Sequence, residues 1–158
     1  MQRISTSAMI LLISIPAIGQ QGYKKIHNQM LDQAKVMLAN EDYEDAAKIY
    51  KKLLPVDPLF VEVFHDMGVC MANIPGKKDH AVTYFEKGVE GRYTESFYEL
   101  GLARHRQQRF DDAVALFEQY KLANGRVVPD AEVDRRKAMS LSAKALTMVP
   151  VDLKIRNM

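Results

Sequence analysis

The chain has 158 residues, of which 47% are hydrophobic and 27% are charged, a composition ordinary for one globular domain. Its 22 basic and 20 acidic residues nearly balance, which argues against charge-driven binding to nucleic acid or to an anionic membrane. Cys70 has no second cysteine with which to form a disulfide, and its place on a predicted helix indicates a buried thiol.

Residues 1–19 have the features of a signal peptide. Arg3 precedes an apolar run over residues 8–15, and Ala17 and Gly19 place small side chains where a signal peptidase requires them. We therefore expect cleavage between Gly19 and Gln20, export, and no membrane insertion of the mature chain. An uncleaved anchor is the alternative, although the run is shorter than the roughly 20 apolar residues that a span needs.

Every later segment reads as helix, because apolar residues recur at spacings of three and four and never alternate. A linker over residues 20–26 leads to the first helix, and a tail over residues 149–158 follows the last. The expected helices, in chain order, cover about residues 25–40, 44–54, 61–73, 80–89, 94–107, 111–123 and 130–147.

The last of these helices has one apolar side and one charged side. Ala138, Leu141, Ala145 and Met148 share a side, and the charged side chains of residues 132–137 lie on the other. We expect the apolar side to pack on the preceding helices, so that residues 129–148 cap the array with their charged side in water.

A small residue, followed about a dozen positions later by alanine and then by an aromatic residue four positions on, occurs three times. The alanines lie 35 and then 32 residues apart, close to the period of a helical-hairpin solenoid. The small residues would let paired helices approach, and the aromatic residues would fill the space between hairpins. The three occurrences are Ala34 with Ala46-x-x-x-Tyr50, Gly68 with Ala81-x-x-x-Phe85, and Gly101 with Ala113-x-x-x-Phe117.

These hairpins resemble tetratricopeptide repeats, and the third, with Phe97-x-x-Leu100-Gly101 before Ala113-x-x-x-Phe117, fits the family pattern best. The resemblance implies an all-α, right-handed solenoid of about three hairpins over residues 27–128, plus the capping helix. It also implies a concave groove, lined by the first helix of each hairpin, that holds an extended peptide or a helix of a partner. The groove positions that it implies are Lys35, Glu62, His65, Val69, Asn73, Glu95, Tyr98, Leu102, His105 and Arg106, with Asn28, Leu31 and Leu38 beside them.

The order of parts also resembles the N-terminal portion of certain Gram-negative envelope proteins. In these, a signal peptide and a short tetratricopeptide block end in a stretch similar to residues 148–157 of this chain. Propeller-like repeats and a peptidoglycan-binding domain of the outer-membrane-protein-A type then follow. The resemblance implies an adaptor that is periplasmic or associated with the outer membrane and whose partner is another envelope protein.

No residues form a recognisable catalytic, cofactor or metal motif. The four histidines and Cys70 lack the paired spacing of a zinc site, and no serine lies in a glycine elbow. Pro75-Gly76-Lys77-Lys78 lacks the first glycine and the hydroxyl residue of a phosphate-binding loop. The sequence therefore predicts a non-catalytic interaction scaffold. The alternative is a structural repeat module that acts through self-association or by packing against another domain, without a peptide ligand.

Overall fold

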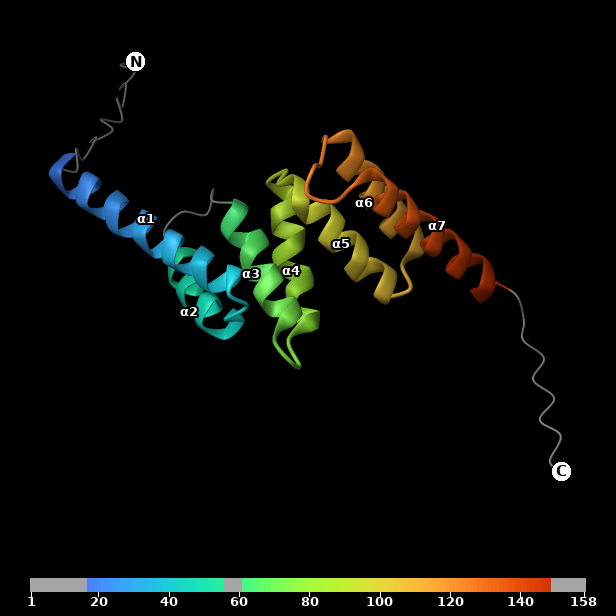
Figure 1. The fold of residues 1–158 in the computed structure, drawn as a ribbon, viewed down its shortest axis with the longest axis horizontal. Coiled ribbons are helices and arrows are strands. Elements are labelled where there is room, and N and C mark those ends of the chain that lie inside the picture. Colours follow the sequence, from blue (N-terminus) through green and yellow to red (C-terminus); the bar gives the residue numbers. More distant parts are fainter. Residues whose placement is uncertain (1–16, 56–60, 149–158) are drawn as a thin grey trace, which may run out of the picture.

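The computed structural model describes residues 17–55 and 61–148, and within these ranges the chain forms seven α-helices and no strand. The helices follow one another along an elongated array, with α1 and α7 at opposite ends (Figure 1). The predicted all-α solenoid is therefore confirmed. Three hairpins pair α1 (Ala17–Ala39) with α2 (Tyr43–Leu53), α3 (Val61–Asn73) with α4 (Lys78–Glu90), and α5 (Thr94–Arg106) with α6 (Phe110–Leu122), and α7 (Asp130–Thr147) follows alone.

Helices α2 to α7 begin and end within two residues of their predicted bounds, whereas α1 begins at Ala17, eight residues earlier than expected. Residues 17–24 contain no proline and several good helix formers, so nothing in them stops the helix. The helix therefore runs through the residues expected as a linker, and the cleavage at Gly19 stays a prediction. Within the described ranges, no helix combines the length and the apolar character needed to cross a bilayer.

Four helices end in the same tight turn, which reverses the chain at little length. The second residue after each helix has a left-handed backbone, with φ of 64° at Glu41, 61° at Arg92, 60° at Gln108 and 62° at Asn124. The next N–H then reaches back five residues, as from Tyr93 to the carbonyl of Gly88 at 2.8 Å. This pattern is the Schellman motif, built here without the glycine that usually occupies its left-handed position.

Small residues bring the two helices of a hairpin into close contact, as the repeat pattern predicted. A Cβ atom added to Gly68 would lie 2.5 Å from the Phe85 ring, and one added to Gly101 would lie 2.7 Å from the Phe117 ring. Both rings are fully buried, and Phe85 also packs against Leu100 of the next hairpin. The aromatic residues therefore fill space both within and between hairpins.

The prediction for α7 is wrong, because the helix packs through its other side. Ala138, Leu141, Ala145 and Met148 are exposed, whereas Val133 and Ser140 are fully buried. Among the described helices, α7 packs mainly against α6 and to a lesser extent against α5, and α6 presents charged groups that pair with the charged side of α7. The ion pairs are Lys121–Asp134 at 2.8 Å, Lys137–Glu118 at 2.9 Å and Lys144–Asp111 at 2.6 Å.

Candidate functional site

The first helices of the hairpins and α7 lie side by side. We call the surface that carries the predicted groove residues of α1, α3 and α5 the first-helix surface, and α7 lies at its end. One polar contact joins each of these helices to the next, which gives three contacts along the array. They are Lys35–Glu62 between α1 and α3, His65–Ser96 between α3 and α5, and His105–Ser140 between α5 and α7. Four predicted groove residues therefore also hold the hairpins together.

The contact between α1 and α3 is an ion pair in partial contact with water. Lys35 Nζ donates to Glu62 Oε1 at 2.7 Å, and the two side chains are 41% and 33% exposed. The hydrogen bond to Glu62 raises the pKa of Lys35, so the lysine is charged at neutral pH. A partner can therefore reach both groups without breaking a buried contact.

The contact between α3 and α5 is largely buried. His65 Nδ1 lies 3.1 Å from the Oγ atom of Ser96, a fully buried serine. The imidazole ring packs against Tyr93, with ring centroids 4.9 Å apart. Burial lowers the pKa of His65 to about 4, which leaves the ring neutral at pH 7. His65 therefore acts mainly as a tie between hairpins, not as an open binding group.

The third contact repeats this arrangement at the end of the array. His105 Nδ1 lies 2.8 Å from Ser140 Oγ, and the Ser140 hydroxyl donates to the Arg136 carbonyl at 3.0 Å. Because the hydroxyl has one proton, Nδ1–H of His105 is the donor to Ser140. Helix α7 thus covers part of the surface that the sequence assigned to a ligand.

Tyr98 is the clearest correction among the predicted groove residues. Its side chain is only 7% exposed and packs against Phe117 and Tyr120, with ring centroids 5.6 and 5.7 Å away. Burial raises the pKa of its hydroxyl, an effect that Arg136 of α7 partly offsets. Tyr98 belongs to the core between α5, α6 and α7, so it cannot serve as an exposed anchor for a partner.

Leu31 is likewise only 7% exposed and belongs to the core of the first hairpin, whereas the other predicted residues keep part of their surface open. Asn73 and Arg106 are exposed at the ends of α3 and α5, and Asn73 also donates to the Val69 carbonyl at 2.9 Å. Val69, Glu95 and Leu102 are half-buried. The open surface therefore combines charged, amide and apolar groups.

Sequence reasoning missed a buried carboxyl group beneath this surface. Asp66 is 7% exposed and accepts a hydrogen bond from the Tyr50 hydroxyl at 2.9 Å. Burial raises the pKa of Asp66 to about 6, although the bond from Tyr50 and the nearby Lys35 act in the opposite direction. Its burial could have been inferred from its position two residues before Gly68, on the side of the helix that faces the preceding hairpin.

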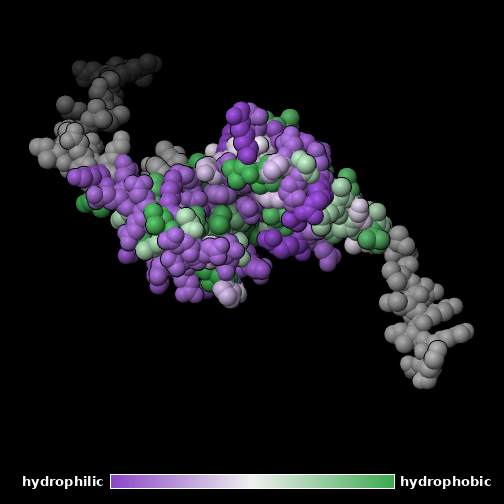
Figure 2. Space-filling view, viewed as in Figure 1, coloured by the Kyte–Doolittle hydropathy of each residue, from purple (hydrophilic) through white to green (hydrophobic). Residues whose placement is uncertain are grey.

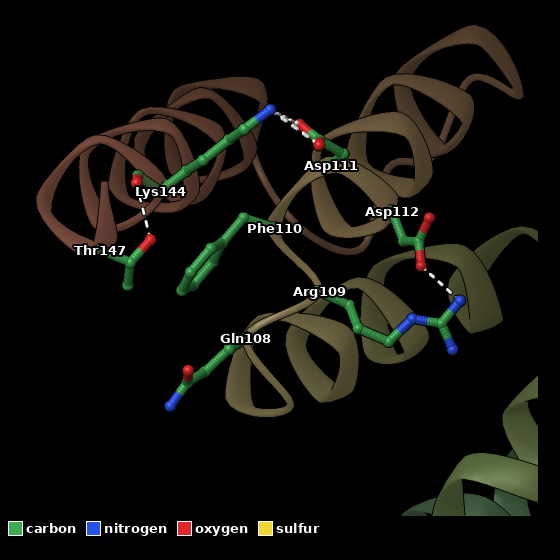
Figure 3. A pocket seen from close by; sticks show the side chains of 7 residues that line it. All are labelled: Gln108, Arg109, Phe110, Asp111, Asp112, Lys144 and Thr147. Carbon is green, nitrogen blue, oxygen red and sulfur yellow. Dashed lines mark hydrogen bonds and ion pairs between the residues drawn. The ribbon is translucent and has the colours of Figure 1, made fainter.

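Two cavities lie at hairpin turns. One, of about 330 Å³, is lined by Gln108, Arg109, Phe110, Asp111, Asp112, Lys144 and Thr147. Figure 3 shows the Phe110 ring pointing into this space, between α7 and the turn before α6. The other, of about 310 Å³, lies between the α1–α2 and α3–α4 turns and includes Asn73. Among the described residues, no group of three or more His, Cys, Asp or Glu side chains could hold a metal ion.

Solved structures with this fold include a type III secretion chaperone and a tetratricopeptide domain. The tetratricopeptide domain of Sgt2 from Aspergillus fumigatus is 17% identical, with a TM-score of 0.66 over 84% of this chain and 87% of that one. PcrH in complex with the chaperone-binding region of PopD is 16% identical, with a TM-score of 0.64 over 78% and 95%. The Yersinia enterocolitica type III secretion chaperone SycD, in complex with a peptide of the translocator YopD, is 18% identical, with a TM-score of 0.62 over 77% and 94%.

Curated protein sequences give no match to the chain. The tetratricopeptide repeat family matches residues 95–122, which lie on α5 and α6, the hairpin whose sequence fits the family pattern best. The chain therefore contains a tetratricopeptide repeat within a fold that tetratricopeptide proteins share.

Proposed function

We propose that this protein is a non-catalytic interaction scaffold that holds a segment of a partner protein on its first-helix surface. The observation that carries the proposal is that α1, α3, α5 and α7 are tied side by side while charged, amide and apolar groups stay open between the ties. PcrH and SycD, which share the fold, have each been solved with a segment of another protein.

The open groups favour a partner segment that is itself mixed in character. Leu102 and Val69 offer apolar surface, and Asn73 and Arg106 offer hydrogen-bond donors at equivalent ends of neighbouring helices. Arginine is also enriched among residues that contribute most to protein–protein affinity. We infer a segment with apolar side chains toward α5 and a carboxylate or carbonyl group near Arg106.

A charge substitution on this surface tests the proposal. We expect Asn73→Arg with Arg106→Glu to abolish recovery of a cross-linked partner from envelope fractions, because both side chains are exposed and bracket the open surface. The matched control makes the same charge changes on second helices, with Gln119→Arg and Lys52→Glu, both also exposed. Equal partner recovery by the two variants, at equal thermal stability, would exclude the first-helix surface as the binding site.

We further propose that the partner lies in the cell envelope. The support is the apolar run of residues 8–15 followed by small residues, together with the resemblance to envelope proteins. Mass spectrometry of the protein from the envelope fraction should show an N-terminus at Gln20. An intact Met1 there would contradict cleavage at Gly19 while leaving the binding surface untouched.

The alternative function, a structural module that acts by self-association, is favoured by a different observation. Leu141 and Met148 of α7 are 52% and 70% exposed, on a side of the helix that faces neither α5 nor α6. This feature is compatible with a scaffold, because it lies away from the contacts that join the first helices.

A further inference from the structure

Helix α7 is packed like the first helix of a hairpin, but residues 17–55 and 61–148 contain no second helix to pair with it. Three first helices share a pattern of burial in which the residues five before and two after a small residue are buried. Around Gly68 these residues are Val63 and Cys70, around Gly101 they are Ser96 and Ala103, and around Ala138 they are Val133 and Ser140, all at most 2% exposed. Ala138 therefore corresponds to Gly68 and Gly101.

In the two earlier hairpins this position packs against a second helix. Gly68 lies against Phe85 of α4, and Gly101 lies against Phe117 of α6. No second helix among the described residues packs against Ala138, which is exposed together with Leu141, Ala145 and Met148. Figure 2 shows apolar residues along the C-terminal half of α7, at the end of the array. The unpartnered side of α7 is thus the side that an antiparallel helix covers elsewhere in the fold.

The spacing of the four exposed residues is the same when read in either direction. From Ala138 the steps to Leu141, Ala145 and Met148 are three, four and three residues, a heptad-like seam. In an antiparallel pair of such helices, Ala138 lies opposite Met148 and Leu141 lies opposite Ala145. Each layer then sets a small side chain against a large one, as close helix packing requires. Such self-complementarity is the requirement for a twofold contact between identical chains.

Charge does not oppose this pairing. Two lysines flank the seam, and each is already paired with α6 of the same chain: Lys137 Nζ lies 2.9 Å from Glu118, and Lys144 Nζ lies 2.6 Å from Asp111. The apolar side chains of Met139 and Leu146, which are 41% and 73% exposed, lie at outer positions of the same heptad, away from the paired side. We propose that α7 of a second copy covers this seam, so that each α7 takes the place that a second helix holds in the earlier hairpins. This inference goes beyond the proposed partner binding and does not depend on it.

The test is the mass of the full chain in solution, measured by sedimentation equilibrium. Four layers bury a modest area, so we expect a dimer with a Kd on the order of 10 µM, populated at about 100 µM chain. Leu141→Glu should weaken the dimer at least about tenfold without lowering the melting temperature, because the side chain is half-exposed in the monomer. The matched control is Leu122→Glu on α6, which replaces a leucine that is 86% exposed and should leave the dimer intact.

Cysteine cross-linking tests the register separately. An Ala138→Cys chain mixed with a Met148→Cys chain should form a disulfide-linked pair, whereas Ala138→Cys alone should not, since its two copies lie about 15 Å apart along the helices. Cys70 is fully buried and does not compete. A monomer at about 100 µM, a dimer that survives Leu141→Glu, or equal cross-linking by Ala138→Cys alone overturns the proposal. A monomer would leave a partner helix or residues beyond 148 to cover the seam. None of these results bears on the Asn73 and Arg106 test, so the two proposals can fail independently.

Discussion

Replacing Gly101 with leucine should destabilise the third hairpin because the space beside Gly101 is already filled. A Cβ atom at this position would lie 2.7, 2.9 and 3.1 Å from three carbons of the Phe117 ring. Phe117 is fully buried, so the ring cannot turn out into water. Overpacking of this kind costs about 1–3 kcal/mol, and leucine adds three further carbons to the first one.

Helix propensity opposes this loss only in part. Leucine is favoured over glycine inside a helix by somewhat less than about 1 kcal/mol. We therefore expect Gly101→Leu to lower the free energy of unfolding by about 2 kcal/mol, and the melting temperature by roughly 4–8 °C. Thermal and urea unfolding followed by circular dichroism would measure both quantities.

Two control variants separate steric overlap from other effects of the substitution. Ala115→Leu adds a leucine at an exposed position of α6 and should leave the melting temperature nearly unchanged. In a Phe117→Leu background, Gly101→Leu should cost less, because the smaller side chain leaves room for it. If Gly101→Leu melts within about a degree of the wild type, or costs the same in both backgrounds, the close approach of α5 and α6 is not what the glycine provides.

Two further substitutions test the turns and the buried carboxyl group. Arg92→Gly should raise the free energy of unfolding, measured in urea titrations, by up to about 1 kcal/mol, because glycine adopts φ near 61° without strain. The control Arg92→Ala keeps the Cβ atom and should give no gain. As the pH rises from 4 to 6, the free energy of unfolding of the wild type should fall relative to that of Asp66→Asn, by on the order of 2 kcal/mol. The pKa of Asp66 in the fold, about 6, exceeds its ordinary value of 3.8, so its contribution is complete below pH 4 and is lost as the pH rises through 6. Asparagine keeps an acceptor for the Tyr50 hydroxyl. Urea unfolding at pH 4 and 7 measures the difference in unfolding free energy between the two proteins, and a difference that is the same at both pH values would contradict the reasoning.

The helices and the close contacts within hairpins could be predicted because neighbouring residues in the sequence determine them. Spacings of three and four specify which residues share a helix side, and Gly101 with Phe117 specify a close approach without reference to other hairpins. Prolines and left-handed turns limit each helix. The bounds of six helices were accordingly predictable to within two residues.

The roles of surface residues could not be predicted in the same way, because they depend on contacts between hairpins. His65 and His105 occupy positions that the family pattern assigns to a groove, yet each is held by a serine on the next first helix. Tyr98 is buried because α7 lies over it. For α7 itself, hydrophobicity indicated the wrong side, since the ion pairs with α6 and the burial of Val133 determine its orientation.

Equivalent positions in the repeats differ in burial because their neighbours differ. Val36 is 60% exposed, whereas Cys70, which corresponds to it in the next hairpin, is fully buried. Both ends of the described array are therefore open, but they are not equally suited to self-association. At the α1 end, exposed glutamines at positions 29 and 33 lie between Ile26 and Val36, so no apolar seam forms. Only the α7 end combines adjacent apolar residues with symmetric spacing, which is why a second copy should bind there.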